Sequence, residues 1–359
     1  MKRRLLALFL AALALLAMGC GANLPDGAPI APAAERTRGE IEQRLLDGLR
    51  SRDEAISDLG RSAEAVGQAV RSVWLDHPEL FWFTGGGTTR TTTLGGTVTG
   101  VSFEPEYAYS ESEIAQLERE LDAVYEAIGL RLGGKSDYEK VRGVYEYVIE
   151  TVDYSGDAGE QDIVPALLRG EGVCAAYARA VQALLLRLDV PCRYVTGAAR
   201  GESHAWNLVC IEGSWYHVDA TWGDPSYSGE AAEFGVSYAY LCLTDEQILR
   251  TRTVEDGQEL PACTDETWNY YRVSGLYLEK YSYGGYSAVY TAALAGGSSA
   301  VSVMFGSREA YRAALAELIS CGGLLQAQQD AEAALDLTPA SEMHYVCDDE
   351  LWILTVLPS

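Results

Sequence analysis

Cys174, His204 and Asp219 are the residues whose types and order could support nucleophilic catalysis. Apolar residues from Tyr177 to Leu188 follow helical spacing, and tracing this stripe backwards places a helix start near Cys174. The positive end of a helix stabilises a thiolate there. Taken alone, a single cysteine is better explained as a small buried apolar residue. The prediction of a nucleophile therefore depends on a base that can reach it.

His204 and Asp219 supply a base and a group that orients it. The chain has only 4 histidines, and His204 lies on an expected strand just after a glycine-containing turn. A thiol nucleophile needs a neighbouring base, and the imidazole needs a third group that fixes its tautomer. A turn centred near position 211.5 would place His204 opposite Asp219 on the next strand. The sequence thus predicts a Cys–His–Asp site.

The elements that must position these residues follow from hydrophobic spacing and turn signals. Capping-box patterns beginning at Ser110 and Ser136 each open an amphipathic helix. The pattern after residue 225 is weaker, with a short helix capped by Thr244 and Gln247. Further expected elements are helices at 36–51 and 62–76, extended segments at 78–83 and 88–103, strands at 192–199, 203–212 and 214–220, a strand at 299–305, a helix at 307–320 and a hairpin at 341–356.

Three segments around these residues resemble the core motifs of the transglutaminase-like superfamily. They are Gly172–Ala178 (GVCAAYA), Ser203–Asn207 (SHAWN) and Tyr216–Trp222 (YHVDATW). The resemblance is strong over residues 138–225 and implies an α+β, papain-like fold. In that fold a helix bearing the nucleophile packs on an antiparallel sheet, here with N- and C-terminal α/β elaborations. It also implies that Cys174 is the nucleophile, His204 the general base and acid, and Asp219 the orienting carboxylate.

The chemistry implied by this resemblance is attack on a peptide amide to give a thioester, which water or an amine then resolves. We expect a peptidase, an amidase or a transglutaminase-type acyltransferase that needs no cofactor. The alternative is a catalytically silent surface lipoprotein that binds peptide or cell-wall polymer. The intact Cys174–His204–Asp219 set favours the enzyme. We expect the backbone N–H of Cys174 to stabilise the oxyanion.

Other residues near the motifs have structural and functional interpretations. Tyr154 and Trp206 are candidates for the substrate cleft, although packing is the favoured interpretation of both. His217 shares a strand face with Asp219 and is expected to be a hydrogen-bonded core residue. Asp224 precedes a proline and is expected in a turn. The spacings lack the close ligand pairs of common zinc motifs, so we predict no metal site.

The remaining cysteines depend on the compartment. The first 19 residues combine Lys2, Arg3 and Arg4 with an apolar run, as in a secretory leader, and Cys20 follows a lipobox-like segment. We therefore predict a lipoprotein acylated at Cys20 and held at the outer face of the cell membrane. Disulfides would be permitted there. A hairpin centred at Gly201 would place Cys192 opposite Cys210, and this pair is a possible disulfide.

Net charge and composition complete the prediction. The formal charge is −25, which disfavours binding to nucleic acid. A peptide or protein outside the cell, including cell-wall peptide, is the expected substrate. The expected organisation is a leader at 1–19, a flexible tether at 20–35, an N-terminal α/β region at 36–135, the catalytic core at 136–228 and a C-terminal α/β region at 229–359.

Overall fold

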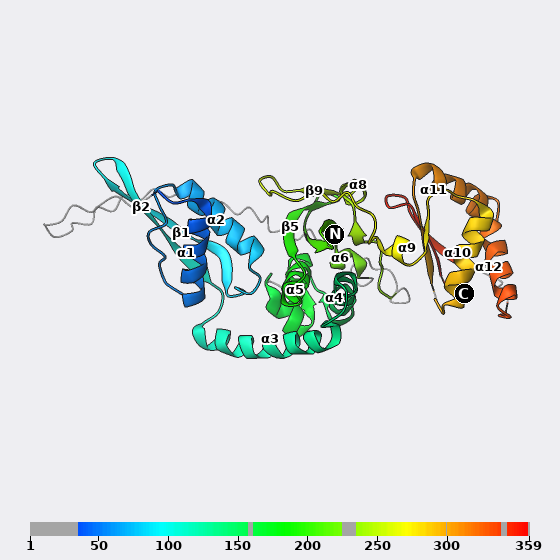
Figure 1. Cartoon of the computed structure of the whole chain (residues 1–359), viewed down its shortest axis with the longest axis horizontal. Coiled ribbons are helices and arrows are strands. Elements are labelled where there is room, and N and C mark those ends of the chain that lie inside the picture. Colours follow the sequence, from blue (N-terminus) through cyan, green and yellow to red (C-terminus); the bar gives the residue numbers. More distant parts are fainter. Residues whose placement is uncertain (1–34, 157–160, 225–234, 299, 339–342, 358–359) are drawn as a thin grey trace, which may run out of the picture.

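The computed structural model of the chain describes residues 35–156, 161–224, 235–298, 300–338 and 343–357. The predicted leader, the acylation site Cys20 and most of the tether lie outside these residues. Three groups of elements follow one another along the longest axis of the molecule, and the central group carries the predicted site (Figure 1). The fold is α+β, as predicted.

The N-terminal group packs two helices against a long hairpin. The helices α1 and α2 begin after Thr37 and Ser62, whose side chains each accept a hydrogen bond from a first-turn N–H. The predicted helices at 36–51 and 62–76 are confirmed, whereas the extended segment predicted at 78–83 is mostly turn. The elements of this group are α1 (Arg38–Ser51), α2 (Ala63–Asp76), β1 (Phe83–Leu94) and β2 (Thr97–Tyr107).

Two long helices connect this group to the central one. Each begins with a complete capping box, at Ser110 with Glu113 and at Ser136 with Glu139, as predicted. They are α3 (Glu111–Leu132), which runs beneath the central elements in Figure 1, and α4 (Asp137–Thr151). A single hydrophobic core runs from α1 and α2 through α4 to the central sheet. The N-terminal elements therefore extend the central core and have no separate core of their own.

The central group is a helix on an antiparallel five-stranded sheet of order β8-β7-β6-β5-β9. The Asn207 side chain donates to the Ala178 carbonyl oxygen at 2.9 Å and so ties the helix α5 to β6. The sheet continues beyond residue 228, where we placed the end of the catalytic core. The elements are β3 (Asp153–Tyr154), the π-helical turn η1 (Pro165–Arg169), β4 (Glu171–Gly172), α5 (Cys174–Arg187), β5 (Cys192–Ala199), β6 (Glu202–Ile211), β7 (Ser214–Val218), α6 (Ala220–Gly223), β8 (Leu241–Leu243), α8 (Asp245–Ile248) and β9 (Arg252–Val254).

The C-terminal group has its own core between helices and a four-stranded sheet of order β10-β11-β13-β12. The predicted strand, helix and final hairpin are present with small shifts of their ends, whereas α10 and α12 were not predicted. The elements are α9 (Tyr270–Val273), β10 (Tyr277–Leu278), α10 (Tyr283–Ala295), β11 (Val301–Phe305), α11 (Arg308–Ala314), the π-helical turn η3 (Leu315–Ser320), α12 (Gly323–Ala334), β12 (His344–Asp348) and β13 (Ile353–Leu357).

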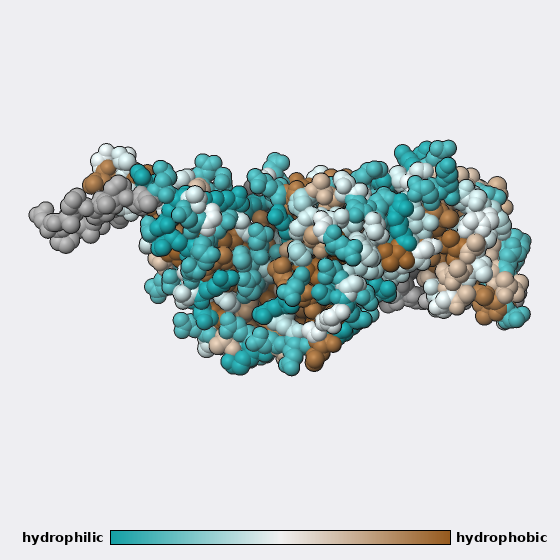
Figure 2. All heavy atoms as spheres, in the orientation of Figure 1, coloured by the Kyte–Doolittle hydropathy of each residue, from teal (hydrophilic) through white to brown (hydrophobic). Residues whose placement is uncertain are grey.

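Most of the face shown in Figure 2 is hydrophilic, with smaller apolar areas over the central and C-terminal groups. Among the described residues, no helix combines the length and apolar character that a bilayer-spanning helix requires.

Candidate active site

Cys174 is the first residue of α5, as predicted. Val173 precedes it with extended backbone, and no side chain caps this end of the helix. The first-turn N–H groups of α5 therefore remain available beside the thiol. Gly172 allows the chain to approach closely here, because a Cβ atom at that position would lie 2.8 Å from Ala176. The thiol is free and partly exposed, as a nucleophile must be.

His204 and Asp219 meet in the interior beside this helix end. The His204 Nε2 lies 2.8 Å from Asp219 Oδ2, and both side chains are almost completely buried. Because a carboxylate only accepts, Nε2 carries the proton and Nδ1 is the nitrogen that remains for the thiol. Burial lowers the pKa of His204, but the Asp219 charge and hydrogen bonds to Asp219 and Cys174 outweigh it and raise that pKa well above its ordinary value.

The contact between His204 and Asp219 arises from a different strand register than the one we predicted. Ile211 pairs with Ser214, and Asn207 pairs with Val218, so the turn is centred at 212.5. Asp219 therefore follows the last paired residue of β7 and lies diagonally from His204. The prediction that the two residues are directly opposite is wrong. Their side chains nevertheless meet because diagonal neighbours of a pleated sheet share a face.

Asp219 is held by more groups than the motif indicated. Its Oδ1 accepts from the Trp222 backbone N–H at 3.3 Å, so it caps the short helix α6. Its Oδ2 accepts from Arg252 Nε at 3.1 Å and from Arg252 Nη2 at 2.6 Å. Burial raises the pKa of Asp219, but His204 and Arg252 outweigh burial and lower it well below the usual carboxyl value. We did not predict Arg252 from the sequence.

Three aromatic residues of the motif region differ in position. Trp222 is partly exposed, and its ring lies nearly perpendicular to the His204 ring with centroids 6.3 Å apart. Trp206 stacks on His204 at 6.1 Å but is only 1 % exposed. Its assignment to the substrate cleft is therefore wrong, since a cleft residue must be reachable from solvent. Tyr154 is partly exposed, with its ring 6.2 Å from that of Tyr177.

A second polar set lies on the same face of the sheet. The Trp206 indole N–H donates to His217 Nδ1 at 2.9 Å, and His217 Nε2 lies 2.8 Å from Asp245. His217 is therefore a hydrogen-bonded core residue, as predicted. Cys263 completes a group of ligand atoms that lie within 4.8 Å of one another. Because His217 Nδ1 accepts a hydrogen bond, Nε2 must keep its proton, and a protonated nitrogen cannot bind a metal.

The structure also shows where Cys192, Cys210 and Asp224 lie. Cys192 pairs with Val209 across the hairpin, because the turn is centred at 200.5 and not at Gly201. Cys210 consequently points to the other face of the sheet, and both thiols are free. The predicted Cys192–Cys210 disulfide is not formed. Asp224 ends α6 and accepts a hydrogen bond from the Tyr177 hydroxyl at 2.6 Å, whereas Asp219 is the carboxylate that contacts His204.

Known proteins are similar to this chain over the part that contains these residues. A family model of the transglutaminase-like superfamily matches residues 126–220. The kyphoscoliosis peptidase of Mus musculus is 27% identical over 121 residues, which are 29% of this chain and 18% of that protein. The Homo sapiens protein of the same name is 28% identical over 106 residues, or 24% and 16%. The chain thus spans less than a fifth of the length of these curated relatives.

A solved structure described as a TGase shares a TM-score of 0.28 and 15% identity with this chain, covering 38% of this chain and 44% of the other. The matched residues contain the helix that begins at Cys174, the strand with His204, and Asp219, in the order that the motifs predicted. Residues 126–220 of this chain therefore match a transglutaminase-like core.

Proposed function

We propose that the protein is a thiol enzyme that attacks peptide amide bonds through Cys174, His204 and Asp219. The observation that carries the proposal is the buried His204–Asp219 contact of 2.8 Å beside a partly exposed cysteine at a helix start. A buried carboxylate that fixes one imidazole nitrogen, and leaves the other for a thiol, is the arrangement that nucleophilic catalysis requires.

The reaction we propose has two stages. The Cys174 proton is held at His204 Nδ1, and the sulfur attacks the amide carbonyl carbon to give a tetrahedral oxyanion. When the C–N bond breaks, His204 gives its proton to the leaving amine, and the acyl group remains on sulfur as a thioester. His204 then takes a proton from water, or from an acceptor amine, whose attack releases the product and restores the thiol. Asp219 stays ionised throughout and stabilises the imidazolium.

The α5 terminus supports the oxyanion in this scheme. The N–H groups of the first helical turn have no intrahelical partner, and Val173 offers them no side-chain cap. We assign the first oxyanion donor to the Cys174 backbone N–H, because it lies on the residue that forms the new bond. Both hydrolysis and acyl transfer use this donor, so it does not distinguish a peptidase from an acyltransferase.

We further propose that this chemistry takes place outside the cell membrane. The support is the sequence of the first 20 residues, in which three cations, an apolar run and Cys20 resemble a lipoprotein leader. The substrate is then an extracellular peptide or protein, including the peptides of a cell wall. Metabolic labelling with a fatty acid, compared between the unchanged chain and Cys20→Ala, tests the anchor directly. Equal labelling of the two proteins would contradict it.

The proposal of a reactive thiol is tested by comparing the alkylation rates of two cysteines in the same molecule. Cys174 and the exposed Cys321 are both free, so each molecule contains its own control. Limited iodoacetamide at neutral pH, followed by peptide mass spectrometry, is expected to modify Cys174 at least about tenfold faster than Cys321. His204→Gln is expected to abolish this preference. Equal rates at the two cysteines would contradict the proposal.

Activity is tested by trapping. A library of peptide amides incubated with the unchanged protein is expected to leave an acyl group on Cys174 that hydroxylamine removes. Cys174→Ser and Cys174→Ala are expected to leave none. If the protein instead retains peptides with equal affinity in the unchanged and Cys174→Ala forms, the chain acts as a binding protein.

A further inference from the structure

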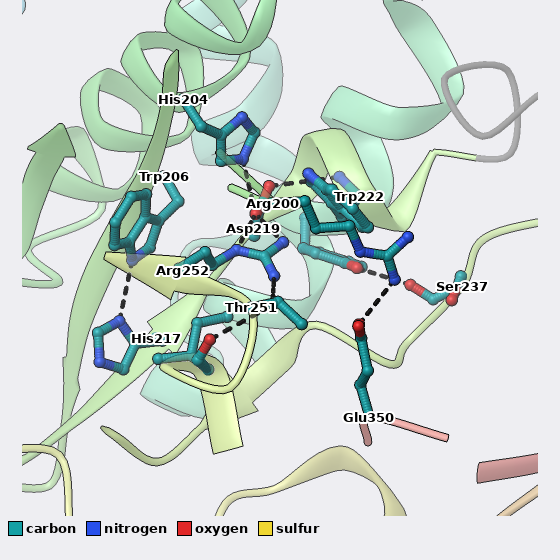
Figure 3. A network of polar contacts seen from close by, with 12 residues as sticks. Arg200, His204, Trp206, His217, Asp219, Trp222, Ser237, Thr251, Arg252 and Glu350 are labelled. Carbon is teal, nitrogen blue, oxygen red and sulfur yellow. Dashed lines mark hydrogen bonds and ion pairs between the residues drawn. The ribbon is translucent and has the colours of Figure 1, made fainter. Parts of the chain in front are cut away.

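Arg252 is a buried cation that reaches the aspartate of the proposed site from the opposite edge of the sheet. It begins β9, which pairs with β5, and Arg252 is the partner of Ala199 there. Its Nε and Nη2 both donate hydrogen bonds to Asp219 Oδ2, at 3.1 and 2.6 Å. Neither of the two side chains has any exposed surface. Figure 3 shows the guanidinium below Asp219, with His204 on the other side of the carboxylate.

The surroundings of Arg252 fix its guanidinium plane. Its Cζ lies 4.6 Å from the centre of the Trp222 ring and 4.5 Å from that of Tyr240. Its Nη1 donates to the Thr251 hydroxyl at 2.6 Å. A guanidinium held by aromatic rings and by several directed hydrogen bonds has little freedom to turn away. The carboxylate that it contacts is therefore held in one orientation as well.

The contact has an electrostatic consequence for His204. Both the imidazole and the guanidinium contact Asp219 Oδ2, at 2.8 and 2.6 Å, so their nitrogens are at most about 5.4 Å apart. Arginine remains charged throughout the useful pH range, so it shares the negative charge of Asp219 with His204 and repels an imidazolium. His204 consequently holds its proton less tightly than a histidine paired with Asp219 alone, and can release it to a leaving amine.

We propose that Arg252 is a positioning residue of the Cys174–His204–Asp219 site, which orients the Asp219 carboxylate and divides its charge between two cations. The proposal rests on the proposed function for its catalytic meaning, but its effect on His204 can be measured without turnover. The charged and titratable groups around the pair are Cys174 on α5, Tyr145 on α4, His217 on β7, Tyr240 before β8, and Arg200 at the β5–β6 turn with its partner Glu350.

The test follows the titration of His204 by NMR in the full chain labelled at histidine. The chain has 4 histidines, so His204→Gln assigns the signal. The background is Cys174→Ala, which removes the thiol from the titration. Arg252→Met is expected to raise the pKa of His204 by about one unit or more, because a cation within about 6 Å is lost. The matched control is Arg250→Met, because Arg250 contacts Glu350 and Trp352 and does not reach Asp219.

Two outcomes overturn the proposal. One is a His204 titration that is the same in folded Arg252→Met and Arg250→Met proteins. The other is measured on the unsubstituted chain, so it does not depend on the folding of a variant. The Arg252 Nε–H signal is expected to exchange slowly with water and to shift with the same pH midpoint as His204. A signal that exchanges rapidly and is insensitive to that titration removes the proposed positioning role.

Activity distinguishes this inference from the proposed function. Arg252→Met is expected to lower kcat about tenfold or more with little change in KM, and Arg252→Lys to recover part of the loss. If Cys174 is unreactive while the His204 titration moves as expected, the enzyme proposal fails and the role of Arg252 in holding Asp219 stands. If Cys174 is reactive and His204 does not move, the inference fails alone.

Discussion

The substitution Asp219→Asn keeps the size of the side chain and removes the charge on which two buried cations converge. Asp219 has no exposed surface and accepts hydrogen bonds from His204, Arg252 and the Trp222 backbone. In the variant, Arg252 would be left buried without a carboxylate. Removing one partner of a buried ion pair costs about 3–5 kcal/mol. Because domains are commonly stable by only about 5–15 kcal/mol, the substitution is expected to lower the free energy of unfolding severely.

The cause of this loss can be separated from simple disruption by a double-mutant cycle. Arg252→Met leaves Asp219 with His204 and the Trp222 backbone N–H as partners and is expected to be destabilising as well. The double variant contains neither the carboxylate nor the guanidinium, so no charge is left buried without its partner in that ion pair. Replacing both members of a buried pair is often close to neutral. We therefore expect the double variant to be at least about 2 kcal/mol more stable than the sum of the two single losses predicts.

The assay is urea unfolding near pH 6, followed by circular dichroism and by tryptophan fluorescence. Trp206 and Trp222 lie beside the site, so fluorescence reports on this part of the core. The m-values of all four proteins must agree, because a changed m-value would mean a changed unfolding reaction. A loss below about 1 kcal/mol for Asp219→Asn, or strictly additive single losses, would refute the account of Asp219 as the centre of a charged network.

Three further predictions concern the sheet around the site. Gly197→Ala is expected to lower the free energy of unfolding by about 1–3 kcal/mol, because its Cβ would lie 2.0 Å from a carbonyl oxygen of β9. The control is Gly129→Ala on an open helix surface, which should be neutral or stabilising in thermal unfolding. Trp206→Phe removes the donor to His217 Nδ1 and is expected to cost about 1–3 kcal/mol in urea unfolding, whereas an unchanged midpoint would contradict that hydrogen bond. Because the pKa of His204 is raised in the folded protein, its contribution to stability is present in full below the ordinary imidazole value and is lost as pH rises through the folded value. Urea midpoints should fall on this alkaline side, and His204→Gln should reduce the fall.

The helices of the site could be predicted because their signals are local. The capping boxes at Ser110 and Ser136 satisfy their own backbone donors within four residues, so the sequence contains the whole interaction. The start of α5 at Cys174 was likewise visible in the apolar stripe that follows it. The helix α10 was missed because Tyr283–Ala295 mixes small residues and tyrosines without a clear apolar face.

The strand registers were predicted incorrectly, although the turns contain the necessary signal. Both hairpins turn through two residues with positive φ, Arg200–Gly201 and Glu212–Gly213. In this turn type the glycine is the second central residue, so the centre of the hairpin lies half a residue before it. Applying that rule gives 200.5 and 212.5, the observed centres. A small shift of register is enough to send Cys210 to the opposite face from Cys192.

Arg252 marks the limit of what motifs can show about this site. It is 33 residues from Asp219 in the sequence, beyond the matched residues 126–220, and no spacing rule connects the two. It reaches the site only because β9 adds to the edge of the sheet beside β5. The proposed nucleophile, base and acid come from a contiguous part of the chain, whereas the charge that balances the acid comes from the residues that follow. The chemistry of the three motif residues is therefore set partly by a segment in which the sequence shows no motif.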